Sequence, residues 1–325
     1  MYQPAMFETL PVKLRPKLDF CVTCKKPGPG LLRCGGCGVV AYCSRECQQQ
    51  DWRAHKQPCR NWLFDAIEAG DRGAEGVGAL LDVGHFDPNT VAGAVRYTPL
   101  ILASARGHIK VAHVLIEKGA DVSMQANNGC TALIAACGYG HIDVVRVLIE
   151  KGADVNVQTN NGCTALMDAC GGGHVDVVRV LIEQGADVSM QDNNGCTALM
   201  IACAGGHVDI VRILIEQGAD MSMQANNGST ALIMACGEGH VDTVRVLIEK
   251  GADVNVQDND GGTALMGACS KGHVDVVRVL IQQGADVNVQ DNYGFAAVML
   301  ACDEGHVDIV RVLIEKGADV SMRIS

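Results

Sequence analysis

Residues 126–158 read ANNGCTALIAACGYGHIDVVRVLIEKGADVNVQ, and near copies of this segment fill most of the chain. The recurrence is easiest to follow at a Gly-His pair that returns every 33 residues. Internal repetition at a fixed period of this size is typical of a stacked-repeat architecture, so the repeat decides the fold class. The histidines of the pair are His108, His141, His174, His207, His240, His273 and His306.

Each repeat contains two short segments that favour helix. In the quoted unit, Thr131 can cap a first helix that begins with ALIAAC. The second segment, residues 141–152, has apolar residues at helical spacing, charged residues on its outer face and Gly152 where a helix would end. Two helices this short cannot bury their apolar faces alone, so the units must stack into one continuous core.

The repeat resembles the ankyrin repeat in its length and in the motifs G-x-T-A/P-L, G-H, V-x-x-L-I and G-A-D. The resemblance implies a mainly α fold, an ankyrin-repeat α-solenoid with short turns or hairpins. We expect seven repeats over residues 93–325 and a degenerate N-terminal capping repeat over residues 60–92. Most units depart from the family by carrying Ala where Pro is usual, and Ile or Met where the first helix usually has His. We therefore expect apolar packing to replace some polar bonds between repeats.

Two recurring residue types suggest chemistry but have simpler structural explanations. Histidines on successive repeats lie roughly 10 Å apart, too far to share one metal ion, so we interpret them as turn and helix-start residues that satisfy backbone groups. The cysteines of the first helices occupy a small-residue position and are interpreted as core: Cys137, Cys170, Cys203, Cys236, Cys269 and Cys302. Three further cysteines, Cys130, Cys163 and Cys196, are expected to form an exposed column.

Residues 21–59 contain eight potential metal ligands, in the pairs C-x2-C, C-x2-C, C-x3-C and H-x3-C. The x2 spacing lets two thiolates reach one ion, and the x3 spacing places two ligands one helical turn apart. Eight such ligands predict two tetrahedral Zn²⁺ ions, which are structural because four protein ligands leave no position open for water. The ligands are Cys21, Cys24, Cys34, Cys37, Cys43, Cys47, His55 and Cys59.

The order of these ligands, with YCSRECQQQDWRAHKQPC at residues 42–59, resembles the MYND zinc finger. The RING family places its His in the middle of the ligand order, which excludes it here. The resemblance implies interleaved pairing: Cys21, Cys24, Cys43 and Cys47 on one ion, and Cys34, Cys37, His55 and Cys59 on the other.

The MYND resemblance also implies a peptide-binding function. Fingers of this family bind short proline-rich peptides, and their contact residues correspond to Gln48 and Trp52, which lie four apart on one helical face. An indole ring is a good platform for proline, and an extended Pro-rich peptide loses little entropy on binding. The alternative is that Trp52 only covers the small core of the finger.

Charge and composition limit the partners and the cellular location that we expect. Residues 1–60 hold ten basic and four acidic residues, a formal net charge of +6, whereas the rest carries −17 of the chain's total of −11. The acidic part would repel nucleic acid. Residues 1–20 are expected to be an N-terminal tail without a secretory signal, and no stretch is long and apolar enough to span a membrane. We therefore expect an intracellular protein, cytoplasmic or nuclear or both, whose cysteines stay reduced.

The solenoid should contact partners through its turn tips and first helices, by correspondence with the family. Aromatic residues often dominate interface energy, and here they fall towards the ends of the array. The candidate contacts are Tyr97, Tyr139, Tyr293 and Phe295. Asparagine pairs such as Asn127-Asn128 also stand at the tips, where Asn can serve turn geometry alone.

The expected function is a zinc-containing protein–protein interaction scaffold without enzymatic activity or a small-molecule substrate. The sequence has no nucleophile elbow and no phosphate-binding loop. His85 and Asp87 imitate the iron-binding His-x-Asp of oxygenases, but no strand-rich segment follows to supply a second His. The alternative function is a nuclear transcription regulator that recruits corepressors or contacts DNA, which the basic N-terminal segment favours.

Overall fold

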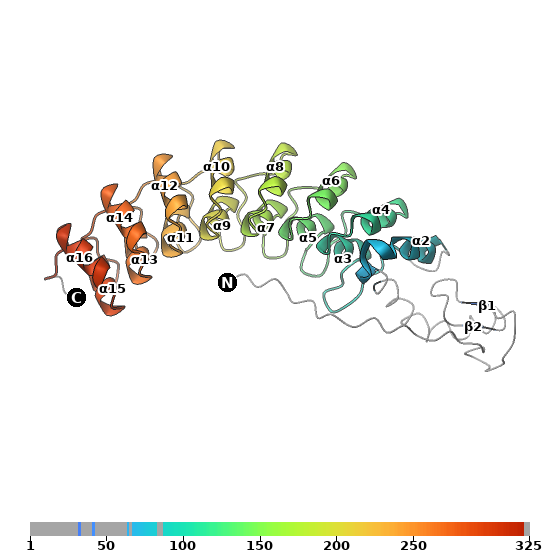
Figure 1. The fold of residues 1–325 in the computed structure, drawn as a ribbon, viewed down its shortest axis with the longest axis horizontal. Coiled ribbons are helices and arrows are strands. Elements are labelled where there is room, and N and C mark those ends of the chain that lie inside the picture. Colours follow the sequence, from blue (N-terminus) through green and yellow to red (C-terminus); the bar gives the residue numbers. More distant parts are fainter. Residues whose placement is uncertain (1–31, 34–40, 43–63, 65–66, 83–86, 322–325) are drawn as a thin grey trace. The chain divides into compact units, whose positions relative to one another are not determined.

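The computed structural model describes residues 32–33, 41–42, 64, 67–82 and 87–321, and the ribbon is shown in Figure 1. The chain divides into two compact units, residues 1–127 and 128–325. In the first unit, β1 (Leu32–Arg33) and β2 (Ala41–Tyr42) pair antiparallel, with Leu32 opposite Tyr42. The other elements of the first unit are η1 (Gly70–Gly73), α2 (Ala74–Asp82), α3 (Pro99–Ala105) and α4 (Ile109–Glu117).

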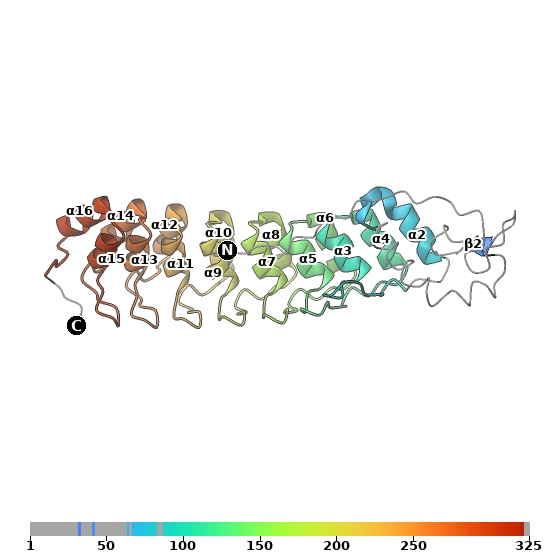
Figure 2. The same ribbon diagram turned by 90° about the horizontal axis from the view of Figure 1, so that it is seen from below.

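The second unit consists of repeated helix pairs, each made of a first helix of seven residues and a second helix of nine. Successive pairs stand side by side, and their turns lie along one edge, at the bottom of Figure 2. The first helices are α5 (Ala132–Gly138), α7 (Ala165–Gly171), α9 (Ala198–Ala204), α11 (Ala231–Gly237), α13 (Ala264–Ser270) and α15 (Ala297–Asp303). The second helices are α6 (Ile142–Glu150), α8 (Val175–Glu183), α10 (Val208–Glu216), α12 (Val241–Glu249), α14 (Val274–Gln282) and α16 (Val307–Glu315).

This arrangement confirms the predicted mainly α solenoid of repeated helix pairs. Each first helix packs against the first helix of the next repeat, and the second helices do the same. The helices alone are too short to be stable in water, so this stacking is what holds them together. Among the described helices, none is long and apolar enough to cross a membrane.

The helix ends follow the sequence prediction. The hydroxyl of Thr131 accepts a hydrogen bond from the amide of Ile134 at 3.2 Å, and the equivalent threonine caps α7, α9, α11 and α13 in the same way. The last described first helix, α15, begins after Ala296 and has no side-chain cap. The second helices end at glycines in the left-handed region, such as Gly152 with φ of +87°.

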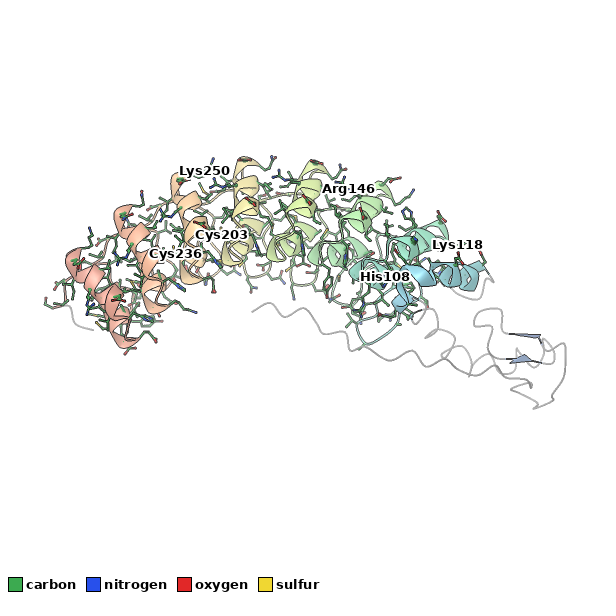
Figure 3. The ribbon with its side chains drawn as sticks, in the orientation of Figure 1. His108, Lys118, Arg146, Cys203, Cys236 and Lys250 are labelled. Atoms are coloured by element: carbon green, nitrogen blue, oxygen red, sulfur yellow. The ribbon has the colours of Figure 1, made fainter. Side chains whose placement is uncertain are left out.

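The core lies between the two helices of each pair and between neighbouring pairs. Leu133 and its equivalents in the next repeats are about 1–2 % exposed, and Leu148 is fully buried. Burying one such side chain stabilises the fold by about 1.5–3 kcal/mol. Figure 3 shows Cys203 and Cys236 in this interior, on α9 and α11.

The prediction that the first-helix cysteines are core is confirmed for five of the six in the second unit, because Cys137, Cys170, Cys203, Cys236 and Cys269 are all fully buried. It is wrong for Cys302, which is exposed. The reason is geometric: Cys302 lies on α15, and no described helix pair packs beyond that repeat to cover it.

One core position, on α12, carries a hydroxyl group where other repeats have an apolar side chain. Thr243 is fully buried and its Oγ1 atom has no hydrogen-bond partner, whereas Val144, Val177 and Val276 occupy the same position in other repeats. A buried polar group without a partner costs about 1–3 kcal/mol. We therefore expect Thr243→Val to raise the free energy of unfolding by about that amount.

Chemical denaturation followed by circular dichroism checks this expectation. The matched reverse change, Val276→Thr, places a hydroxyl at the equivalent position of α14 and should lower stability by a similar amount. If Thr243→Val is neutral or destabilising, the hydroxyl has a partner in solution and the argument fails.

Candidate binding surfaces

The predicted zinc ligands and the peptide-contact residues Gln48 and Trp52 lie outside the described residues. What the structure gives of this segment is the β1–β2 pair, and Cys34 and Cys43 are the residues that follow these strands in the sequence. Seven thiols and one imidazole within 39 residues form a donor set that suits Zn²⁺. The residues present therefore fit the metal by the chemistry of their donors.

The turn tips of the second unit are joined to one another by hydrogen bonds. The side-chain amide of Asn193 donates to the carbonyl of Asn160 at 2.9 Å, and Asn226, Asn259 and Asn292 each donate to the preceding tip in the same way. Backbone bonds run beside them, such as Asn226 N to Asn194 O at 2.8 Å. The first asparagine of each tip is thus a structural residue, which favours the turn-geometry interpretation.

The Gly-His column also joins successive repeats. Nε2 of His174 lies 3.1 Å from the carbonyl oxygen of Gly138 in the preceding repeat. The same contact recurs at the following repeats, with distances of 3.0–3.3 Å, for His207, His240, His273 and His306. The prediction that these histidines bind backbone groups is confirmed. Within the described part of the chain, no cluster of three or more His, Cys, Asp or Glu could hold a metal ion.

We expected apolar packing to replace some polar bonds where the first helix lacks the family's His, and this is confirmed, because Ile134, Met167 and Met200 at that position are 1–2 % exposed. Polar bonds made by other residues still connect the repeats. The histidine bond and the turn-tip bonds connect repeat to repeat, and glutamines add to them: Gln158 Nε2 donates to Gln191 O at 3.0 Å. These bonds fix the spacing of the repeats and make the second unit a regular frame for surface residues.

The column of Cys130, Cys163 and Cys196 is half-buried, so the prediction that it is exposed is wrong. Burial raises the pKa of Cys130 to about 12 and, with the charges of Asp168 and Asp192 as smaller causes, raises the pKa of Cys163 to about 11. At neutral pH these thiols stay protonated. Since the thiolate is the nucleophile and the metal ligand, the raised pKa values disfavour both roles for Cys130 and Cys163.

The four aromatic candidates differ in exposure. Tyr97 is half-buried beside α3, and Tyr139, which is 40 % exposed, stacks on His141 with ring centroids 6.2 Å apart. Tyr293 is 61 % exposed and Phe295 is half-buried. The structure thus brings Tyr293 and Phe295 together on the turn before α15, whereas Tyr97 and Tyr139 belong to two other turns.

Asp260 lies on one of the turn tips expected to contact partners, although it is not one of the four aromatic candidates. Its Oδ1 atom accepts a hydrogen bond from the Tyr293 hydroxyl at 3.5 Å. The sequence alone could single out Asp260, because the equivalent residue in the preceding repeats is asparagine: Asn128, Asn161, Asn194 and Asn227.

Comparison with known proteins places the chain in a family. The family model described as ankyrin repeats matches residues 100–192, 152–225, 181–258 and 250–324, which together cover more than half of the chain. The chain therefore belongs to the ankyrin-repeat family. The MYND finger model matches residues 21–59, so this ankyrin-repeat protein carries an N-terminal MYND finger, which implies zinc binding.

Curated relatives resemble only a short part of the chain. A match to Tudor domain-containing protein 1 of Oryzias latipes is 38 % identical over 60 residues, 18 % of this chain and 5 % of that protein. Ubiquitin C-terminal hydrolase 15 of Oryza sativa subsp. japonica is 47 % identical over 49 residues, 15 % of this chain and 5 % of the relative. SET domain-containing protein 14 of Caenorhabditis elegans is 42 % identical over 42 residues, 13 % of this chain and 10 % of the relative. The chain thus spans a tenth or less of these relatives, whose activities do not transfer to it.

Proposed function

We propose that this protein is a non-enzymatic adaptor, in which the MYND finger binds a proline-rich peptide and the ankyrin solenoid binds a second protein. The observation that carries the proposal is the presence of both interaction modules in one chain. The protein acts inside the cell, in the cytoplasm, the nucleus or both, and has neither a nucleic-acid nor a small-molecule ligand.

The chemistry of the described side chains supports a binding role over catalysis. Burial raises the pKa of the Cys130 and Cys163 thiols, which favours their protonated form, and five histidine rings of the second unit contact backbone carbonyls: His174, His207, His240, His273 and His306. A general base or a nucleophile must be free to exchange protons with a substrate. Side chains engaged in this way have a structural role.

In the finger, two Zn²⁺ ions would be held by eight ligands with interleaved pairing. The ions would cross-link a segment too small to bury a core, and Gln48 and Trp52 would then present one face of the finger to the peptide. The metal supplies structure only, because four protein ligands on each ion leave no position for a reacting group.

The test is to titrate the full chain with a library of proline-rich peptides and to measure its zinc content. We expect two zincs per chain and micromolar binding of some peptides, weakened at least about tenfold by Trp52→Ala. Gln49→Ala is the matched control, because on the predicted helix residue 49 would belong to a different face from Gln48 and Trp52, and it should bind normally. Equal binding by the wild type and Trp52→Ala would refute the peptide site.

A nuclear transcription regulator is the second candidate, and the net charge of +6 in residues 1–60 favours it. Direct DNA contact through this segment would give an affinity that falls steeply with salt. The adaptor proposal expects no DNA binding at physiological salt, because the remaining chain carries −17. A gel-shift series over salt concentration separates the two.

A further inference from the structure

Among the aromatic residues whose exposure the structure describes, the most exposed one lies on the turn before α15. Tyr293 is 61 % exposed, compared with 40 % for Tyr139, in a sequence with few aromatic residues. Its hydroxyl contacts the exposed carboxylate of Asp260 on the neighbouring turn, and Phe295 lies two residues further on. We call Asp260, Asp291, Tyr293 and Phe295 the Tyr293 tip.

The backbone of the Tyr293 tip is held in place before any partner arrives. Oδ1 of Asp291 accepts hydrogen bonds from the amides of Tyr293 at 2.9 Å and Phe295 at 2.8 Å. The amide of Asn292 donates to the carbonyl of Asp260 at 2.8 Å, which joins the two turns. Because the tip is already fixed, little conformational entropy is lost when it binds, and this loss offsets little of the free energy that its contacts contribute.

The other repeats show that the frame does not need these residues. Asn194 and Asn227 stand where the Tyr293 tip has Asp260 and Tyr293, and the backbone bond between turns is the same: Asn226 N to Asn194 O is 2.8 Å, like Asn292 N to Asp260 O. The substitutions add an exposed ring and a negative charge without changing the joint between repeats. What they change is the surface.

We propose that the Tyr293 tip binds an arginine side chain presented by the solenoid's protein partner. A guanidinium is planar, stacks on an aromatic face and pairs with a carboxylate, so Tyr293 and Asp260 together supply both contacts. The net charge of −11 would attract a basic segment over a longer range. This inference rests on the proposed function, because it names the chemistry that the solenoid's partner must present.

The experiment uses the full chain with its five tyrosines labelled with ¹³C in the ring, followed by NMR. The probe is a short flexible peptide that contains arginine and leucine, and its twin carries citrulline, which keeps the shape but loses the charge. We expect the arginine peptide to shift the Tyr293 signal with at least about tenfold tighter binding than the citrulline peptide. Asp260→Asn, which restores the residue of other repeats, should lose most of this difference in the NMR titration. Tyr293→Asn removes the signal itself, so its affinities for the two peptides are measured by calorimetry and should differ little.

A gain of function provides the matched control. Asn161→Asp together with Asn194→Tyr builds the same pair on an inner joint, where Asp192 accepts hydrogen bonds from the amides of residues 194 and 196 as Asp291 does at the Tyr293 tip, and it should add a second arginine site. Equal binding of the citrulline peptide, binding unaffected by either single change, or a Tyr293 shift caused by raising the protein concentration alone would overturn the proposal. None of these results touches the finger's peptide site, so the adaptor function is tested separately.

Discussion

Gly195→Ala should destabilise the second unit by about 3 kcal/mol, which is a large fraction of the stability of an ordinary domain. Gly195 has φ of +76°, where an alanine side chain costs roughly 1–2 kcal/mol. An added Cβ would also lie 2.6 Å from Oδ1 and 2.7 Å from the backbone N of Asn226, the residue that joins this tip to the next. Overpacking against a backbone atom costs a further 1–3 kcal/mol or so.

Gly185→Ala separates these two costs. Gly185 has φ of +83°, but a Cβ there would meet no atom within 4 Å. This control should lose only the roughly 1–2 kcal/mol of backbone strain. Denaturation curves give the difference in stability, and amide hydrogen exchange at Asn226 should accelerate in Gly195→Ala alone. Equal losses in the two variants would mean that the turn-tip bonds do not hold the repeats together.

Removal of zinc should abolish binding of a proline-rich peptide, a loss of at least about a hundredfold, while the helical signal of the second unit persists. The reason is that a 39-residue finger has too little core to fold without its metal, whereas the solenoid's core contains none of the predicted ligands. Circular dichroism and peptide titration before and after chelation measure both effects, and returned Zn²⁺ should restore binding.

Substitutions test which cysteines hold the metal. Cys24→Ser should lower the zinc content and the affinity for the peptide, because it removes a predicted ligand. Cys302→Ser is the matched control, since this exposed cysteine lies in the last repeat. Unchanged zinc content in Cys24→Ser, or a loss in Cys302→Ser, would contradict the ligand assignment.

The helices could be predicted from the sequence because their signals are local. Thr131 lies three residues from the amide it caps, and Gly152 stands at the end of its own helix. The apolar spacing within one repeat also indicates which face is buried. These features depend on a few neighbouring residues, and repetition confirms each of them several times within one chain.

The bonds between repeats could not be predicted in the same way. His174 meets the carbonyl of Gly138 across 36 residues, and that contact depends on how far one repeat is displaced from the next. The exposure of Cys302 depends likewise on what packs beyond it, and the half-burial of Cys163 on the residues around it. For the finger, the ligands and the contacts of Trp52 remain sequence predictions.

The central claim is that one chain holds two partners at once, and a biosensor tests it most directly. A proline-rich peptide on the surface captures the full chain, and the arginine peptide is then passed over it. We expect the captured chain to bind the second peptide, with capture lost in Trp52→Ala and only the second binding lost in Asp260→Asn. If the arginine peptide displaces the captured chain, or binding at the two sites is mutually exclusive, the protein is not an adaptor of this kind.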